Sequence, residues 1–220
     1  MALSPEAFVA ELDAQNRAAL ERIAVATSSG EPDASLTVAR LLMLALKNEI
    51  EATECAAAWI ATTPEIDVKL ALARQAGDEA KHYRLIQRRL ADLGVATDAH
   101  DPLSAGRSPL ATFLLGLEGT VARVAAGQFT REALAVVRNA EFARFCRSRG
   151  DDATARLYEE TIQPDEQHHH ELGRTLLLAL ATTDAAQAAA RGASAKVLAI
   201  ADELQEVARL KMGISRAPGC

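Results

Sequence analysis

Between residues 35 and 61, hydrophobic and polar positions follow one another with the period of an α-helix. The apolar or small side chains fall on one face of that helix. These positions are Leu42, Leu46, Thr53, Ala56 and Ile60. A single acidic residue, Glu49, interrupts this inward stripe. Because a buried carboxylate is costly unless it is paired or binds a metal, the pattern makes Glu49 a candidate metal ligand.

Capping residues, prolines and glycines predict further helices along most of the chain. Asp33 or Ser35 is expected to cap the helix that carries Glu49. The expected helices cover residues 5–26, 35–61, 64–94, 109–148 and 152–181, an Ala-rich segment from 184, and 194–212. The predicted fold is all-α and forms a single domain over 1–220. Its centre is a four-helix bundle over residues 36–181, flanked by an N-terminal packing helix within 1–30 and C-terminal helices over 184–212.

Several segments should depart from regular helix. Residues 95–108 contain Pro102 and Gly106 and are long for a tight turn, so we expect a crossover between two helical hairpins. The helix over 109–148 is expected to bend or break at Gly127-Gln128. Pro164 predicts either a kink beside a site or a tolerated bend. The tail over 213–220 is expected to be frayed.

The chain contains the pattern Asp-Glu-x-x-His twice, at residues 78–82 and 165–169. Positions three apart on a helix share a face, so Glu79 with His82, and Glu166 with His169, can each direct an oxygen and a nitrogen at one point. The flanking residues repeat at the same separation of 87 positions. The pattern therefore indicates a duplicated helix–turn–helix, with one carboxylate–imidazole pair on each copy.

Two such pairs on facing helices, with one further Glu from each of the other two helices, form a site for two metal ions. In the first hairpin, Glu49 and Glu79 lie equally far from the turn at Pro64, which favours Glu49. Glu51 and Glu54 compete, but Glu51 falls off the inward face and Glu54 lies nearer the turn.

In the second hairpin the partner of Glu166 should lie near residue 135, which is Ala. Glu132 is the nearer acidic residue and Glu141 the farther one. The internal repeat instead favours Glu141, because it matches Glu54. The predicted metal ligands are therefore Glu49, Glu79, His82, Glu132, Glu166 and His169, with Glu141 as the alternative to Glu132.

Residues around the motifs suggest supporting roles. Asp78 and Asp165 point away from the ligand face, where each could accept the second ring N–H of a metal-bound His or form an ordinary salt bridge, for example with Arg74 or Arg174. His168 and His170 face other directions than His169 and are expected to be solvated or to support the ligands.

Composition and charge exclude several classes of protein. The net charge is −6 without a basic block, which argues against nucleic acid as a partner. Cys55, Cys146 and Cys220 lack zinc or disulfide spacing. The N-terminus does not resemble a signal peptide, and the longest apolar run is too short to span a membrane. We expect a cytoplasmic protein.

The motifs resemble those of the ferritin-like di-iron carboxylate superfamily, on the side of rubrerythrin, aldehyde-deformylating oxygenase and tRNA hydroxylase. The likeness covers residues 36–181, and it implies that Glu49, Glu79, His82, Glu166 and His169 are iron ligands. The family spacing in the helix over 109–148 points near Val136 or Val137, which cannot bind metal, so the choice between Glu132 and Glu141 stays open. The chain lacks a rubredoxin-like CxxC pair.

The resemblance implies an oxidoreductase that activates O2 or peroxide at two Fe ions, or at Mn, and hydroxylates or oxidises a small apolar substrate. Electrons would come from a separate donor, because no flavin or NAD motif occurs. The alternatives are a ferroxidase or iron-binding protein without an organic substrate, and a non-enzymatic helical interaction protein. A homo-oligomer is compatible with each.

Overall fold

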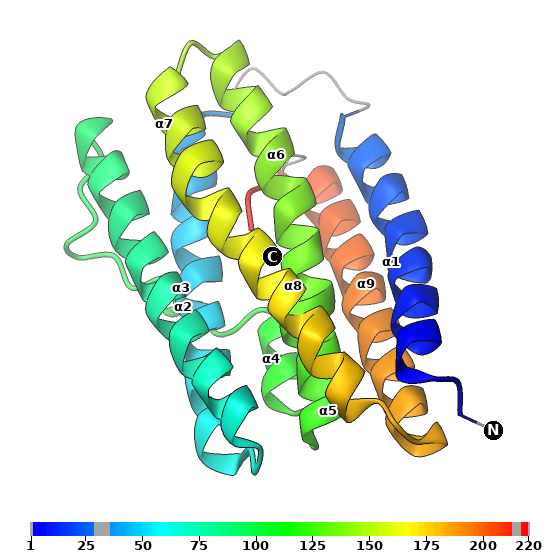
Figure 1. Cartoon of the computed structure of the whole chain (residues 1–220). Helices are drawn as coiled ribbons and strands as arrows, with labels where there is room; N and C mark the ends of the chain where they lie inside the picture. Colours follow the sequence, from blue (N-terminus) through cyan, green and yellow to red (C-terminus); the bar gives the residue numbers. More distant parts are fainter. Residues whose placement is uncertain (1, 29–35, 213–216, 220) are drawn as a thin grey trace.

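The computed structural model describes residues 2–28, 36–212 and 217–219, and it is built from packed α-helices (Figure 1). The regular elements are α1 (Pro5–Ser28), α2 (Val38–Thr62), α3 (Ile66–Asp92), α4 (Pro109–Leu115), α5 (Thr120–Val124), α6 (Glu132–Ser148), α7 (Asp152–Leu157), α8 (Gln163–Leu180) and α9 (Asp184–Met212). Two wider π-helical segments, η1 (Ala125–Arg131) and η2 (Tyr158–Ile162), join α5 to α6 and α7 to α8. The predicted all-α class is confirmed.

Four long rods form the centre of the molecule. Helices α2 and α3 make an antiparallel hairpin, and the continuous rods α5–η1–α6 and α7–η2–α8 make a second. At one end of the bundle the Thr120 hydroxyl donates to Glu65, at 2.7 Å, and at the other end Arg89 donates to Asp151, at 2.8 Å. Helix α3 and the rod α5–η1–α6 therefore run in the same direction, which requires a connection that travels the length of the bundle.

That connection is the segment over residues 93–108, followed by the short helix α4. It returns along the outside of α2, where Arg107 pairs with Glu54 at 2.8 Å. The Ser108 N–H and hydroxyl both donate to the Glu51 carboxylate, each at 2.6 Å. The Ser108 hydroxyl also caps α4 by accepting from the Ala111 N–H. Glu51 and Glu54 thus hold the crossover in place.

Two predicted helix boundaries are wrong. The helix expected over 109–148 breaks at 116–119, where Gly119 has φ +79°, a backbone conformation that favours glycine. At Gly127 and Gln128, where a bend or break was expected, the regular α-helix is interrupted by the π-helical segment η1. The helix expected to start at Ser194 is the second half of α9, since Ser194 is buried and accepts a hydrogen bond from the Thr130 hydroxyl at 2.8 Å.

The ends of other elements show why sequence boundaries are approximate. Helix α2 is capped by Thr37, whose side chain accepts from the Arg40 N–H at 3.2 Å. The predicted caps Asp33 and Ser35 lie outside the described residues. Pro164 is the second residue of α8 and follows directly on η2, where the Gln163 N–H bonds to the Tyr158 carbonyl. The irregularity that the proline predicts is therefore a widened helical turn.

Part of the C-terminal tail is held inside the bundle, contrary to the frayed tail expected for it. Pro218 and Gly219 are buried. The Asn48 amide of α2 donates to the Pro218 carbonyl at 2.9 Å, and the Gly219 N–H donates to Asn139 of α6 at 2.8 Å. The tail therefore ties α2 to α6. Residues 213–216 and 220 lie outside the described residues.

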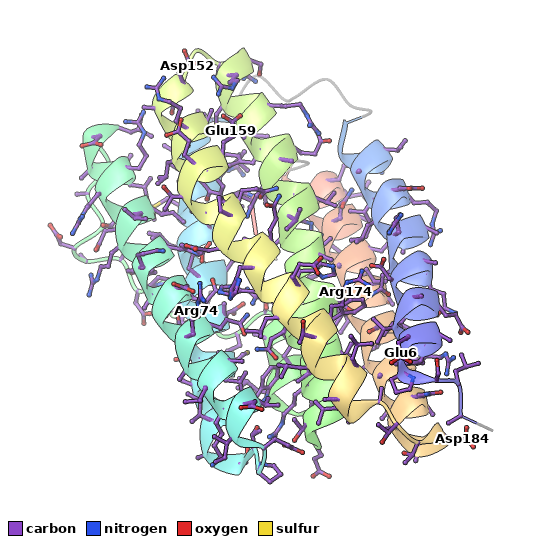
Figure 2. The ribbon with its side chains drawn as sticks, viewed as in Figure 1. Glu6, Arg74, Asp152, Glu159, Arg174 and Asp184 are labelled. Atoms are coloured by element: carbon purple, nitrogen blue, oxygen red, sulfur yellow. The ribbon has the colours of Figure 1, made fainter. Side chains whose placement is uncertain are left out.

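Two buried apolar clusters lie on either side of the middle of the bundle. One contains Leu42, Ile86 and Phe142. The other contains Trp59 and Phe129. The labelled charged side chains in Figure 2 lie on the outer faces of the helices, as a solvated surface requires. None of the described helices combines the length and apolar character needed to cross a bilayer.

The contact between α8 and η1 depends on Gly173. A Cβ atom added there would lie 2.7 Å from the Gln128 carbonyl carbon and from the Phe129 nitrogen, which are backbone atoms that cannot turn aside. We expect Gly173→Ala to lower the free energy of unfolding by about 1–3 kcal/mol through overpacking. Urea denaturation followed by circular dichroism measures this change.

Gly192 in the exposed face of α9 provides the matched control, because nothing lies within 4 Å of its added Cβ. Gly192→Ala should raise the free energy of unfolding by about 0.5–1 kcal/mol, since alanine loses less backbone entropy in a helix. Equal effects of the two substitutions would contradict the close approach of α8 to η1.

Candidate metal centre

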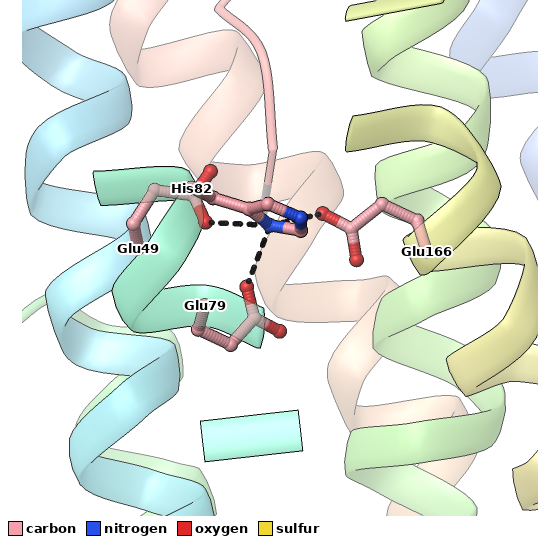
Figure 3. A group of neighbouring side chains, drawn as sticks. All are labelled: Glu49, Glu79, His82 and Glu166. Atoms are coloured by element: carbon pink, nitrogen blue, oxygen red, sulfur yellow. Dashed lines mark ion pairs between the residues drawn. The ribbon is translucent and has the colours of Figure 1, made fainter. Parts of the chain in front are cut away.

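The middle of the bundle gathers six titratable side chains from four rods. They are Glu49 of α2, Glu79 and His82 of α3, Glu132 of α6, and Glu166 and His169 of α8. None is more than 3% exposed. Figure 3 shows four of them, with the His82 ring between Glu49, Glu79 and Glu166. All six residues predicted as ligands therefore meet in one buried place. That they bind metal stays a prediction.

The six side chains form two overlapping groups. In one group Glu49, Glu79, His82 and Glu166 offer ligand atoms within 4.8 Å of one another. In the other, Glu132 and His169 join the same Glu79 and Glu166 within the same distance. Two carboxylates are common to both groups. This arrangement suits two adjacent ions, each with its own His and its own Glu, joined by two shared carboxylates.

The distances repeat between the two halves of the site. The His82 Nδ1 atom lies 3.5 Å from Glu79 Oε2 and 3.9 Å from Glu166 Oε1. The His169 Nδ1 atom lies 3.5 Å from Glu166 Oε2 and 3.7 Å from Glu79 Oε1. The His82 Nδ1 atom is also 3.5 Å from Glu49 Oε2. Each imidazole thus directs Nδ1 at the shared carboxylates.

The inward atoms of the site have no hydrogen-bond partner in the described part of the chain. They are Glu49 Oε2, both oxygens of Glu79, His82 Nδ1, Glu132 Oε2, Glu166 Oε2 and His169 Nδ1. Buried polar atoms are nearly always paired, and an unpaired one costs about 1–3 kcal/mol. A convergent set of unpaired oxygen and nitrogen atoms is what cations would satisfy. The residues therefore fit a pair of metal ions.

The outer nitrogen of each imidazole is held by the opposite hairpin. The His82 Nε2 atom lies 3.0 Å from Asp165, and the His169 Nε2 atom lies 3.1 Å from Asp78. A carboxylate at Nε2 places the ring proton there and leaves the Nδ1 lone pair directed inward. The contact with an imidazole and the ordinary salt bridge that were considered for these aspartates occur together, because Asp78 also pairs with Arg74 at 3.4 Å. Lys81 joins Asp165 at 2.5 Å.

The structure distinguishes between Glu132 and Glu141, the two candidates for the acidic residue of α6. Glu132 is fully buried, and its Oε1 accepts hydrogen bonds from Gln75 at 2.6 Å and Arg131 at 2.9 Å. Its Oε2 has no hydrogen-bond partner in the described part of the chain. Glu141 pairs with Arg144 on its own helix and belongs to neither group. Among the two, only Glu132 reaches the centre of the bundle.

Sequence reasoning missed Gln75 and Arg131. Gln75 lies four residues before Glu79 on the inward face of α3, and this helical spacing could have indicated it. Arg131 carries no such signal. The other histidines lie apart from the site: His168 is exposed, and His170 stacks on Phe129 and contacts its carbonyl through Nδ1 at 2.7 Å.

Crowding of charge shifts several pKa values. Burial raises the pKa of Glu49 to about 7, although its contact with His82 opposes the shift. Burial, followed by the charge of Glu79, raises the pKa of Glu166 well above its usual range. Burial alone would lower the pKa of His82, but contacts with Glu49 and Glu79 raise it to about 11. The cluster therefore retains protons in the places where cations would bind.

No family model, curated protein or solved structure matches the chain.

Metal binding should release protons, because ligand atoms must be deprotonated to bind. Glu49 and His82 carry raised pKa values, so acidification through pH values near 7 keeps protons on the site and should weaken metal affinity. Calorimetric titration with Mn(II) in buffers of different ionisation enthalpy measures the released protons. An observed enthalpy independent of the buffer, with an affinity independent of pH, would contradict this expectation.

The crossed aspartates should control metal affinity. Asp165→Asn keeps an acceptor near His82 Nε2 but removes its charge, so we expect metal affinity to fall by about 10–100-fold. The matched control is Asp152→Asn, which changes an aspartate that is 62% exposed and pairs with Arg147 at the surface. Equilibrium titration with Mn(II) compares the two. An unchanged affinity in Asp165→Asn would show that His82 is oriented by packing alone.

Proposed function

We propose that this protein is an oxidoreductase of the ferritin-like di-iron carboxylate type, which activates O2 or peroxide at two metal ions held by the six residues of the centre. One observation carries the proposal: seven oxygen and nitrogen atoms without a hydrogen-bond partner in the described part of the chain converge in a buried space, while the outer nitrogens of both imidazoles contact aspartates. A purely structural polar cluster would pair these inward atoms with one another or with donors from the surrounding helices.

The donor set favours iron or manganese. Imidazole and carboxylate together suit first-row ions of intermediate hardness, and positions left open beside the protein ligands can accept a small molecule. Bound iron would supply the one-electron steps by which O2 or peroxide is activated. Fe at both positions, or Mn in place of Fe, is compatible with these ligands.

The residues of the centre would have different roles in holding the two ions. Glu79 and Glu166 lie between the two ion positions and are the carboxylates that both ions would share. One ion position would be completed by Glu49 and His82. The other would be completed by Glu132 and His169. Asp78 and Asp165 hold the ring protons of the imidazoles at Nε2.

The surroundings of the centre support chemistry that must be kept from water. The ligand carboxylates and imidazoles are almost completely buried, and apolar clusters lie on both sides of them. Exclusion of water protects reactive species and strengthens the electrostatic contacts of the site. We propose a small apolar organic substrate and a separate electron donor, because the sequence carries no flavin, NAD or CxxC motif of its own.

Ligand substitutions test the centre directly. We expect the wild-type protein, loaded anaerobically with Fe(II), to bind two ions per chain. Glu79→Ala and Glu132→Ala should each lose at least one ion, because each removes a ligand atom that nothing else replaces. Metal analysis after gel filtration measures the stoichiometry, and circular dichroism confirms that the variants are folded.

Glu141→Ala is the matched control, since Glu141 lies on the same helix as Glu132 and belongs to neither group. It should still bind two ions. Wild-type protein that binds no Fe(II) would refute the centre. Protein that binds iron and assembles into a large closed shell, without oxidising any organic compound, would indicate iron handling instead of an oxygenase.

A further inference from the structure

The two candidate ion positions have different surroundings, because among the described residues a buried guanidinium lies beside the Glu132 carboxylate and none is found beside Glu49. Arg131 precedes Glu132 in the chain and is 8% exposed. Its Nη1 atom lies 2.9 Å from Glu132 Oε1 and 3.9 Å from Glu79 Oε1. The Gln75 amide donates to the same Glu132 oxygen at 2.6 Å. Two donors therefore occupy one oxygen of Glu132, and Oε2 alone is left for an ion.

Glu49 occupies the equivalent place at the other position, and its surroundings differ. The contact described for its carboxylate is with His82 Nδ1, itself a ligand atom, at 3.5 Å. Glu49 Oε2 accepts no hydrogen bond in the described part of the chain. No donor other than the candidate ligand atom His82 Nδ1 is described at Glu49 Oε2, so this oxygen is available to an ion.

The contacts of Glu132 and those of Glu49 would have opposite effects on the affinity for a cation. At the Glu132 and His169 position the guanidinium neutralises part of the Glu132 charge and repels a divalent ion directly, and both effects are large where water is excluded. At the Glu49 and His82 position no Arg or Lys of the described segments is found in contact with the carboxylate. Hydrogen bonds that orient a ligand favour binding, but the neutral Gln75 amide supplies that orientation without any repulsion.

We propose that Arg131 makes the two ion positions unequal: the Glu49 and His82 position fills first, and the Glu132 and His169 position binds its ion more weakly and exchanges it more readily. This inference rests on the proposed di-metal function. Arg131 is a positioning residue, because it affects the ion through its contact with Glu132 and through its positive charge. It does not itself ligate an ion.

Titration of the metal-free, full-length protein with Mn(II) under anaerobic conditions tests the inequality. Calorimetry should resolve two binding events whose affinities differ by about tenfold or more, the scale that one nearby buried charge produces. At one equivalent of Mn(II), electron paramagnetic resonance should show mainly isolated ions and few magnetically coupled pairs. Two events of equal affinity, with coupled pairs dominant at one equivalent, would overturn the proposal.

Substitution of Arg131 tests whether its charge causes the difference in affinity between the two ion positions. Arg131→Gln removes the charge and keeps a donor, so the second event should tighten by about tenfold and coupled pairs should appear at one equivalent. Arg131→Lys keeps the charge and should preserve two separate events. The matched control is Arg174→Gln, because Arg174 pairs with Asp13 on the outer side of α8. A separation of the two events that is the same in Arg131→Gln as in the wild type would overturn the role of Arg131.

Variants of the two unshared carboxylates keep the proposal testable if Arg131→Gln does not fold. Glu132→Gln should retain the tight event and lose the weak one, and Glu49→Gln should lose the tight event. The opposite order would overturn the proposal. Wild-type protein that binds no Mn(II) and no Fe(II) would refute the di-metal function itself, whereas two ions bound equally would leave that function standing and refute only the inequality.

Discussion

The electrostatic problem at the middle of the bundle governs the rest of the structure. Four carboxyl groups and two imidazoles share a space from which water is excluded, and burial alone would make each charged form unfavourable. The chain lowers this cost with contacts at the outer edges of the ligands. Asp78 and Asp165 hold the imidazoles, and Gln75 with Arg131 holds Glu132. The inward atoms have no hydrogen-bond partner in the described part of the chain, which costs stability and which bound cations would satisfy.

The surrounding helices bring these six side chains together. The widened turn η1 ends immediately before Glu132, and η2 ends four residues before Glu166. Such turns occur often at functional sites, because they change which residues face the interior. Gly173 lets α8 approach the backbone of η1, and the crossover bonded to Glu51 and Glu54 lets α3 and the rod α5–η1–α6 run in the same direction.

Much of this arrangement could be predicted from local geometry in the sequence. The spacing of Glu79 and His82 is set by the helix itself, and the equal distances of Glu49 and Glu79 from a tight turn place them at one depth. The same reasoning was less decisive for Glu132, whose hairpin contains two π-helical segments that alter the count of residues per turn. Arg131 could not be anticipated, because its burial depends on packing between distant helices.

Helix breaks were predicted less well than the convergence of the six side chains, for a related reason. Ser194 resembles a helix start in sequence, but its hydroxyl bonds to Thr130 and to the Ala125 carbonyl of another rod, so it lies within α9. Pro218 and Gly219 resemble a loose end, yet Asn48 and Asn139 hold them. In both places long-range hydrogen bonds override the structure that the local sequence favours. The pattern of neighbouring residues does not reveal these long-range bonds.

The crossed aspartate–histidine contacts are consistent with an origin of the chain by duplication of one hairpin. They join Asp78 to His169 and Asp165 to His82. Each hairpin orients the imidazole of the other and not its own, and the hairpins run as a twofold axis perpendicular to the bundle would relate them. Two identical copies of one hairpin would form the same reciprocal contacts, as an isologous dimer does. Gene duplication and fusion of such a self-pairing ancestor would then allow its halves to diverge, so that one acquired Arg131 where the other has none.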